Sequence, residues 1–169
     1  MSIQEKLSKI QMILSDVDGV LTDGSLIFDA AGSEIKSFSA RDGLGTRIWL
    51  DKGYLFGFVT RRETEVVRRR AAELKIHACY QGAGKKVEHL EPICAQFHLE
   101  PSQIAYLGDD LVDWEFMRRV GIAAAPADAV QEIKEIAHIV TQVPGGKGVA
   151  REVIEMILKA KGEWNDFGF

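Results

Sequence analysis

Two carboxylates, Asp16 and Asp18, stand two residues apart in the segment DVDGVLTDG (residues 16–24), at the end of a short apolar run. Side chains at such a spacing on an extended backbone point the same way. One carboxylate can then attack a phosphorus atom while the other handles the proton of the leaving group. Gly19 allows the chain to turn sharply just after them. An isolated pair of this kind is equally compatible with a surface turn or a simple cation site.

A second acidic cluster lies in GDDLVD (residues 108–113), after another apolar run. If Asp109 and Asp113 approach the first pair, the carboxylates repel one another unless a cation joins them. A ligand set made only of oxygen atoms suits Mg²⁺, which also keeps water and phosphate oxygens in its coordination shell. Taken alone, Asp109 or Asp110 could instead cap a helix.

Two further side chains suit a phosphorylated ligand. Thr60 ends an apolar run and offers a hydroxyl group to a phosphate oxygen, and Lys86 follows a glycine-containing loop and could offset phosphate charge. The segment GAGKK is not a P-loop, because Cys79 stands at its first glycine position and Lys86 at its Ser/Thr position. Each of these two residues is a weak signal by itself.

The elements that must position these residues alternate along the chain. We expect strands at 12–17, 55–59, 77–80, 104–107, 122–124 and 139–141, and helices at 42–52, 64–74, 85–97, 113–120, 129–137 and 149–161, the first of them capped by Asp42. This alternation predicts an α/β, Rossmann-like fold with a mostly parallel sheet and helices on both faces. Such sheets bind ligands at the carboxyl ends of their strands, where Asp16, Thr60 and Asp109 stand.

The spacing between the motifs limits what else the chain can form. Residues 25–28 and 34–39 flank the segment DAAG and predict a small β-hairpin insert. The stretch between Gly24 and Thr60 has room for this hairpin and one helix, and the stretch between Thr60 and Asp109 has no room for a folded insertion. We therefore expect no large cap domain, and one domain over residues 1–169.

The composition restricts the partners. The chain has 21 basic and 25 acidic side chains and a net charge of −4, which argues against nucleic acid but not against a small phosphorylated substrate. No apolar run approaches a membrane span, and MSIQEKLSKIQ lacks the apolar core of a signal peptide. Cys79 and Cys94 form no CxxC pair and no zinc pattern with the histidines, so we expect buried thiols in a reducing cytoplasm.

In this order, the segment DVDGVLTDG, Thr60, Lys86 and the segment GDDLVD resemble the four motifs of the haloacid dehalogenase superfamily. The resemblance implies a phosphatase in which Asp16 is the nucleophile and Asp18 the general acid/base. It implies Mg²⁺ held by Asp16, the backbone carbonyl of Asp18 and Asp109, with Asp113 in support. Thr60 and Lys86 would orient and neutralise the phosphoryl group, and Asp16 would carry it as a phosphoaspartate.

Further segments resemble one family of these enzymes, the 3-deoxy-D-manno-octulosonate (KDO) 8-phosphate phosphatases: TDG (22–24), RDG (41–43), YQG (80–82) and GGKGVARE (145–152). The resemblance implies a sugar-acid phosphate as substrate, and a homotetramer whose sites are closed by the hairpin and the C-terminal tail of neighbouring subunits. The substrate-binding residues that we expect are Arg41, Arg62, Gly145, Gly146, Lys147 and Arg151. GGKG could instead simply connect a strand to the last helix.

The chain also departs from the family pattern. Arg61 stands where the family usually has glycine, and Lys85 where it usually has Asn or Asp before the motif lysine. Arg62 matches the family arginine and could pair with a substrate carboxylate, whereas a sister group acting on a nine-carbon acid 9-phosphate tends to lack it. The nine-carbon substrate is therefore the alternative. A receiver-like or regulatory phosphatase-fold domain is the alternative that is not an enzyme.

Overall fold

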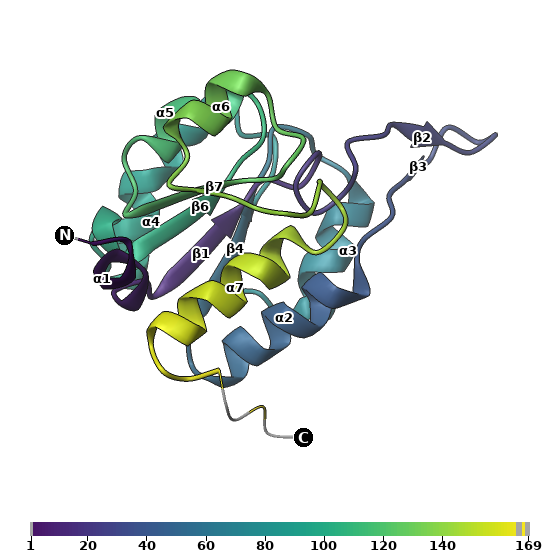
Figure 1. Ribbon diagram of the computed structural model, residues 1–169. Coiled ribbons are helices and arrows are strands. Elements are labelled where there is room, and N and C mark those ends of the chain that lie inside the picture. The colour runs from purple at the N-terminus through teal and green to yellow at the C-terminus, as the bar shows by residue number, and fades with distance from the viewer. Residues whose placement is uncertain (1, 165–166, 168–169) are drawn as a thin grey trace.

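The computed structural model describes residues 2–164 and 167, and its centre is a six-stranded sheet in which all strands are parallel (Figure 1). The strand order is β5-β4-β1-β6-β7-β8. The strands are β1 (Met12–Ser15), β4 (Leu55–Val59), β5 (Ala78–Tyr80), β6 (Ile104–Leu107), β7 (Ile122–Ala125) and β8 (Ile139–Val140). The α/β fold predicted from the alternation of apolar runs and helical patterns is confirmed.

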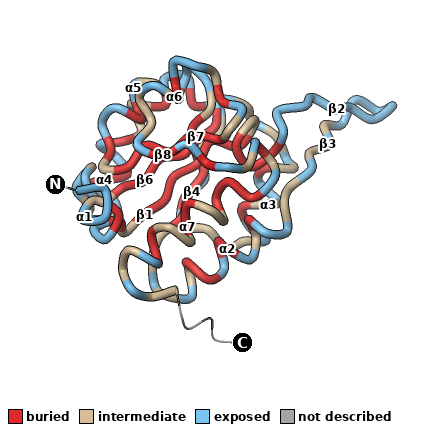
Figure 2. Tube along the Cα trace, viewed as in Figure 1, coloured by how far each residue is buried: buried red, intermediate tan, exposed pale blue. Residues whose placement is uncertain are grey.

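Helices cover both faces of this sheet. On one face lie α1 (Ile3–Ser8), α2 (Ala40–Asp51), α3 (Glu65–Leu74) and α7 (Val149–Ala160), and on the other α4 (Leu90–Phe97), α5 (Trp114–Met117) and α6 (Gln131–Ile136). Side chains along each strand alternate between the two cores: Ile13 packs toward α7, while Met12 and Leu14 pack toward α4. Most residues of the sheet are therefore buried, as Figure 2 shows, and exposed ones occur only on the edge strands β5 and β8 of the described sheet.

A two-stranded antiparallel hairpin, β2 (Ile27–Phe28) and β3 (Glu34–Ile35), projects from the sheet domain between β1 and α2 (Figure 1). Four large apolar side chains on it are exposed: Leu26, Ile27, Phe28 and Ile35. The small insert and the lack of room for a larger cap agree with the spacing in the sequence.

The order of the strands reverses its direction beside β1, which makes this position a topological switch point. From β1 the chain moves outward to β4 and β5, then returns to β6 on the other side of β1 and continues to β7 and β8. The carboxyl ends of β1 and β6 therefore lie side by side, with Ser15 in register with Leu107. A crevice at this position is where open parallel sheets bind ligands.

Some predicted details of the helices and thiols were wrong. The helix α2 starts at Ala40 with Ser39 as its cap, because the Asp42 side chain turns inward and accepts the backbone N–H of Arg151. The helix expected at 85–97 opens as a 3₁₀ turn, η1 (Lys86–His89), and the one at 113–120 shortens to η3 (Leu111–Asp113) and α5. α1, with a Ser2–Glu5 capping box, was not predicted. Cys94 is buried, but Cys79 is exposed.

Candidate active site

The nucleophile candidate is fixed by the sheet. Asp16 directly follows β1, and its backbone N–H donates to the carbonyl of Leu107 over 2.9 Å, which extends the pairing with β6 by one residue. Its side chain is buried, and its Oδ1 accepts the N–H of Val17 over 2.7 Å. The carboxylate therefore has a fixed direction, which positional catalysis requires.

The second acidic cluster meets the first at the switch point. Carboxylate oxygens of Asp16, Asp109 and Asp113 all lie within 4.8 Å of one another. The approach depends on Gly19, because a Cβ there would lie 2.0 Å from Oδ2 of Asp109. Gly19 also has a φ of +90°, which side chains disfavour. The glycine expected from the sequence to permit a turn thus also makes room for a carboxylate.

Lys86 lies in the middle of this cluster and is 2% exposed. Its Nζ lies 2.6 Å from Oδ2 of Asp16 and 2.7 Å from Oδ1 of Asp113. The same oxygen of Asp113 accepts the hydroxyl of Tyr106 over 2.6 Å, and its other oxygen accepts the backbone N–H of Asp109 over 3.2 Å. Lys86 and Asp113 therefore form the buried support of the site.

The three clustered carboxylates carry more negative charge than Lys86 alone can neutralise. Burial, followed by the charges of Asp16 and Asp113, raises the pKa of Asp109 to about 8. Burial and the charge of Asp113 likewise raise the pKa of Asp16, although Lys86 opposes the shift. Oδ1 of Asp109 is buried with no hydrogen-bond partner in the described part of the chain. An uncompensated buried carboxylate is costly, so the donor set fits a bound cation.

Comparison with known proteins assigns this arrangement to a family. Residues 78–153 match the model of the haloacid dehalogenase-like hydrolases. The 3-deoxy-D-manno-octulosonate 8-phosphate phosphatase of Yersinia pestis is 37% identical over 157 residues, which are 93% of this chain and 84% of that protein. The chain belongs to the 3-deoxy-D-manno-octulosonate 8-phosphate phosphatase family. It is a phosphomonoesterase.

Solved structures of family members have the same fold. The crystal structure of the Yersinia pestis phosphatase superposes with a TM-score of 0.96 and 35% identity, and the match covers 99% of this chain and 91% of that one. A phosphatase from Moraxella catarrhalis, solved in complex with a magnesium ion, a phosphate ion and KDO, gives a TM-score of 0.94 at 34% identity over 96% of this chain and 94% of its own.

Thr60 occupies the corresponding strand end on the other side of β1 in this phosphatase. It follows β4, is 1% exposed, and its backbone N–H donates to the carbonyl of Tyr80 over 2.9 Å. Its carbonyl accepts the N–H of Ala83 over 3.1 Å, which ties the Lys86 loop to the same edge. Both departures from the family pattern, Arg61 and Lys85, are exposed, and neither interrupts these bonds.

Asp18 lies at the outer side of the cluster and is partly exposed. Its Oδ1 is ion-paired with Nζ of Lys36, and its Oδ2 lies 4.0 Å from Nε of Arg62. Arg62, predicted from the sequence to bind substrate, thus does stand beside the acid pair. The pairing with Lys36 was not predicted.

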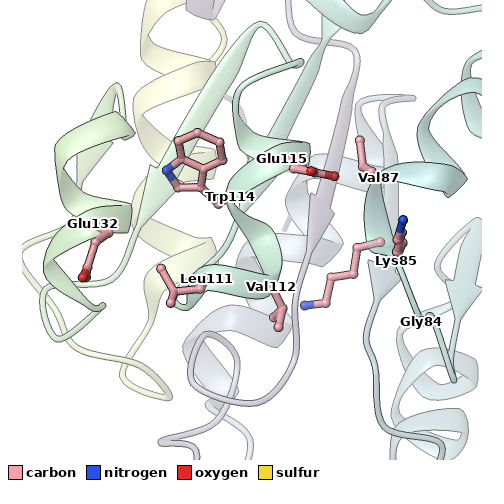
Figure 3. A pocket seen from close by; sticks show the side chains of 9 residues that line it. Gly84, Lys85, Val87, Leu111, Val112, Trp114, Glu115 and Glu132 are labelled. Carbon is pink, nitrogen blue, oxygen red and sulfur yellow. The ribbon is translucent and has the colours of Figure 1, made fainter.

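A pocket of about 590 Å³ opens next to Lys86 (Figure 3). The segment after β5 and the segment after β6 face one another across it; its lining residues are Gly84, Lys85, Lys86, Val87, Leu111, Val112, Trp114, Glu115 and Glu132. Leu111 and Val112 are exposed there. Lys86 connects this pocket to the carboxylate cluster, although none of the three clustered carboxylates is among its lining residues.

The other predicted substrate residues lie elsewhere in the chain. Arg41, Lys147 and Arg151 line a second pocket, of about 510 Å³, whose described lining includes none of the clustered carboxylates. Gly145 and Gly146 instead pack on the Asp16–Gly24 loop: a Cβ on Gly145 would lie 2.2 Å from the carbonyl oxygen of Gly19. Within one chain the GGKG segment therefore supports the acid-pair loop, and its role in substrate binding stays a prediction.

Three contributors to the site were missed. Tyr106 reads as an ordinary apolar strand residue, yet its hydroxyl binds Asp113. In the sequence, Glu34 and Lys36 look like ordinary charged residues of a hairpin. In the structure, Lys36 is ion-paired with Asp18 and Glu34 with Arg62. The available signal was the spacing of Glu34 and Lys36, because side chains two residues apart on a strand share a face.

Proposed function

We propose that this chain hydrolyses a sugar-acid phosphate, KDO 8-phosphate, to KDO and inorganic phosphate through a phosphoaspartate on Asp16. The observation that carries the proposal is the fixed, buried Asp16 carboxylate at the switch point, within reach of Lys86 and two further carboxylates. The eight-carbon substrate is supported by the Moraxella catarrhalis relative, which binds KDO and phosphate. The catalytic unit is proposed to be one domain over residues 1–169.

The cofactor is Mg²⁺, in keeping with the relative that holds a magnesium ion and with the all-oxygen donor set of this chain. We propose that Asp16, Asp109 and the backbone carbonyl of Asp18 hold it, with Asp113 in support. The unpartnered Oδ1 of Asp109 is the observation that favours this assignment. When bound, Mg²⁺ neutralises the carboxylates and withdraws charge from the phosphoryl oxygens.

The proposed reaction has two steps. In the first, an Asp16 oxygen forms a bond to phosphorus as the bond from phosphorus to the sugar oxygen breaks, and Asp18 gives that oxygen its proton. In the second, Asp18 takes a proton from water, the water oxygen bonds to phosphorus, and the bond to Asp16 breaks. Phosphate leaves, Asp16 is again a free carboxylate, and Asp18 again carries its proton.

The neighbouring side chains would stabilise the transferring group. Lys86 offsets its negative charge from a buried position, where electrostatic interactions are stronger than in water. Thr60 offers its hydroxyl from the adjacent strand end. Arg62, at the open side of the site, suits a bidentate contact with a carboxylate of the substrate.

We also propose that the active form is a homotetramer whose sites are completed by neighbouring subunits. A phosphatase must keep water from the transferring group, and the hairpin is the only insert between the strands of the described chain. Four exposed apolar side chains on one short hairpin favour burial against another subunit. The guanidinium of Arg151, which lines the second pocket, lies over the ring of Trp164 in the same chain. Most of the tail after Trp164 lies outside the described residues.

The free thiols of Cys79 and Cys94 support a reducing compartment, the cytoplasm, as the place of this activity. None of the helices within the described residues is long and apolar enough to cross a membrane.

The test is phosphate release by the purified chain from KDO 8-phosphate and from a nine-carbon 2-keto-3-deoxy acid 9-phosphate. We expect Mg²⁺-dependent release with kcat/KM at least about tenfold higher for the eight-carbon ester, the discrimination that about 1.4 kcal/mol provides. Equal or reversed preference would refute the assignment of the substrate, and lack of release from either ester would refute the assignment to sugar acids.

A further inference from the structure

The hairpin contacts the acid pair through Lys36, and Glu34 on the same hairpin is paired with Lys36. Glu34 and the residue just after β3, Lys36, share a face of the extended chain. Nζ of Lys36 is ion-paired with Oδ1 of Asp18, and it lies 2.7 Å from Oε1 of Glu34. A segment 18 residues further along the chain therefore reaches back to the proposed general acid/base.

Arg62 closes these contacts into a ring. Its Nη2 lies 3.0 Å from Oε2 of Glu34, and its Nε lies 4.0 Å from Oδ2 of Asp18. Acidic and basic side chains alternate around this ring in the order Asp18, Lys36, Glu34 and Arg62. We call these four residues the charge ring. Its members come from the acid-pair loop, the hairpin and the segment after β4, so it joins three separate parts of the fold.

Within the charge ring, Lys36 and Glu34 are more buried than Arg62. The Lys36 side chain is fully buried and that of Glu34 is 9% exposed, whereas that of Arg62 is 40% exposed. Burial alone would raise the pKa of Glu34, but the hydrogen bonds from Lys36 and Arg62 outweigh it and lower that pKa. Buried and mutually paired charges are held much more firmly than surface ion pairs.

The two oxygens of Asp18 are not equivalent in this arrangement. Oδ1 is occupied by Lys36, whereas Oδ2 is buried without a hydrogen-bond partner among the described residues. A carboxylate rotates easily about its last torsion, so an unpaired Asp18 would not keep this difference. Lys36 therefore selects which oxygen is free, and proton transfer requires that this oxygen be within hydrogen-bond reach of the leaving oxygen.

We propose that Lys36, backed by Glu34, is a positioning residue that holds Asp18 with Oδ2 directed to the leaving oxygen. This inference rests on the proposed role of Asp18 in phosphomonoester hydrolysis. It adds no chemical step, and the proton still passes between Asp18 and the leaving oxygen. It makes a specific demand: loss of Lys36 slows formation of the phosphoaspartate only where the leaving group needs a proton, whereas hydrolysis of the phosphoaspartate, which also uses Asp18, is slowed alike for every ester.

The test compares Lys36→Met with wild type on two esters in saturating Mg²⁺. One is an alkyl phosphate, KDO 8-phosphate or any other alkyl ester that the wild type hydrolyses, and the other is p-nitrophenyl phosphate, whose leaving group needs no proton. The quantity to measure is the rate of leaving-group release in a single turnover with saturating enzyme in excess, because it follows the first step alone. For the alkyl ester we expect this rate to fall by roughly 10–100-fold, less than the loss of about 10²–10⁴-fold expected on removal of the general acid itself. For p-nitrophenyl phosphate the rate should change by less than about threefold.

Conservative and control variants complete the experiment. Lys36→Arg keeps the charge and should recover part of the lost turnover, and Glu34→Gln should show the same split between esters at smaller amplitude. Lys9→Met, an exposed lysine after α1, should behave as wild type. If Lys36→Met fails to fold, as judged by circular dichroism, the difference between the two esters is measured with Glu34→Gln instead.

Three results would overturn the proposal: an unchanged rate of leaving-group release, an equal loss of that rate on both esters, or a loss that disappears at higher enzyme concentration, which would make Lys36 a substrate-binding residue. Failure of the assigned sugar-acid substrate is seen separately, because it appears in the wild type and leaves the comparison of esters intact.

Discussion

Replacement of Lys86 by Met would remove the only cation that the described residues place inside the carboxylate cluster. Met keeps the length of the side chain but leaves Asp16 and Asp113, now 2.6 Å and 2.7 Å from the lysine nitrogen, without their shared partner. Breaking a buried pair by removing one partner costs about 3–5 kcal/mol of the free energy of unfolding. We expect a loss of this size in EDTA, measured by urea denaturation.

Mg²⁺ should restore part of that stability, because the ion binds the folded carboxylates and not the unfolded chain. Turnover should not recover, since Lys86 also offsets phosphoryl charge, and we expect kcat to remain on the order of 10²–10³-fold below wild type. The matched control is Lys85→Met, which removes an exposed neighbour. A loss below about 1 kcal/mol, or one equal to that of the control, would refute the view that Lys86 holds the cluster together.

Further predictions concern the metal, the hairpin and a buried acid. Asp109→Asn should raise the Mg²⁺ concentration needed for half-maximal activity by at least about tenfold, and an unchanged requirement would exclude Asp109 as a ligand. Phe28→Ser with Ile27→Ser should reduce the oligomer to smaller species in light scattering, and an intact tetramer would show that the hairpin does not assemble it. Burial, opposed by N–H groups of α7, raises the pKa of Asp42 from 3.8 to about 6. Because the folded state holds that proton more tightly, its contribution to stability is complete below pH 3.8 and is lost as the pH rises through about 6. The unfolding free energy of wild type relative to Asp42→Asn should therefore fall by about 3 kcal/mol between pH 3.5 and pH 7, and parallel pH curves would contradict this.

The sequence predicted the sheet and the carboxylate cluster well, because both depend on local patterns. Apolar runs mark buried parallel strands, and polar residues at their carboxyl ends must converge at one edge. Asp16, Asp109 and Asp113 converge for this reason. Helix starts were less predictable: Asp42 resembles a cap, yet α7 supplies it with N–H groups that only the tertiary fold brings near.

The charge ring shows what local patterns cannot predict. The spacing of Glu34 and Lys36 indicates only that they share a face, and not that Lys36 is fully buried against Asp18, because that contact depends on how the hairpin folds back over the sheet edge. In the GGKG segment, by contrast, a local sequence pattern suggests one role and the fold gives the residues another. Its glycines suggest an anion loop, but within the chain Gly145 and Gly146 mainly let two backbones approach closely.

The proposed mechanism requires Asp16 to become covalently phosphorylated. The most direct measurement is peptide mass spectrometry of protein quenched in acid during turnover with Mg²⁺ and KDO 8-phosphate. Asp18→Asn should be used beside wild type with p-nitrophenyl phosphate, because this ester forms the intermediate without a general acid, while loss of the general base slows hydrolysis of the intermediate. We expect one phosphoryl group on the peptide that contains Asp16, more of it in Asp18→Asn, and none in Asp16→Asn, which should also lack turnover. Wild-type turnover by Asp16→Asn, or a phosphoryl group found on another residue, would refute the phosphoaspartate mechanism.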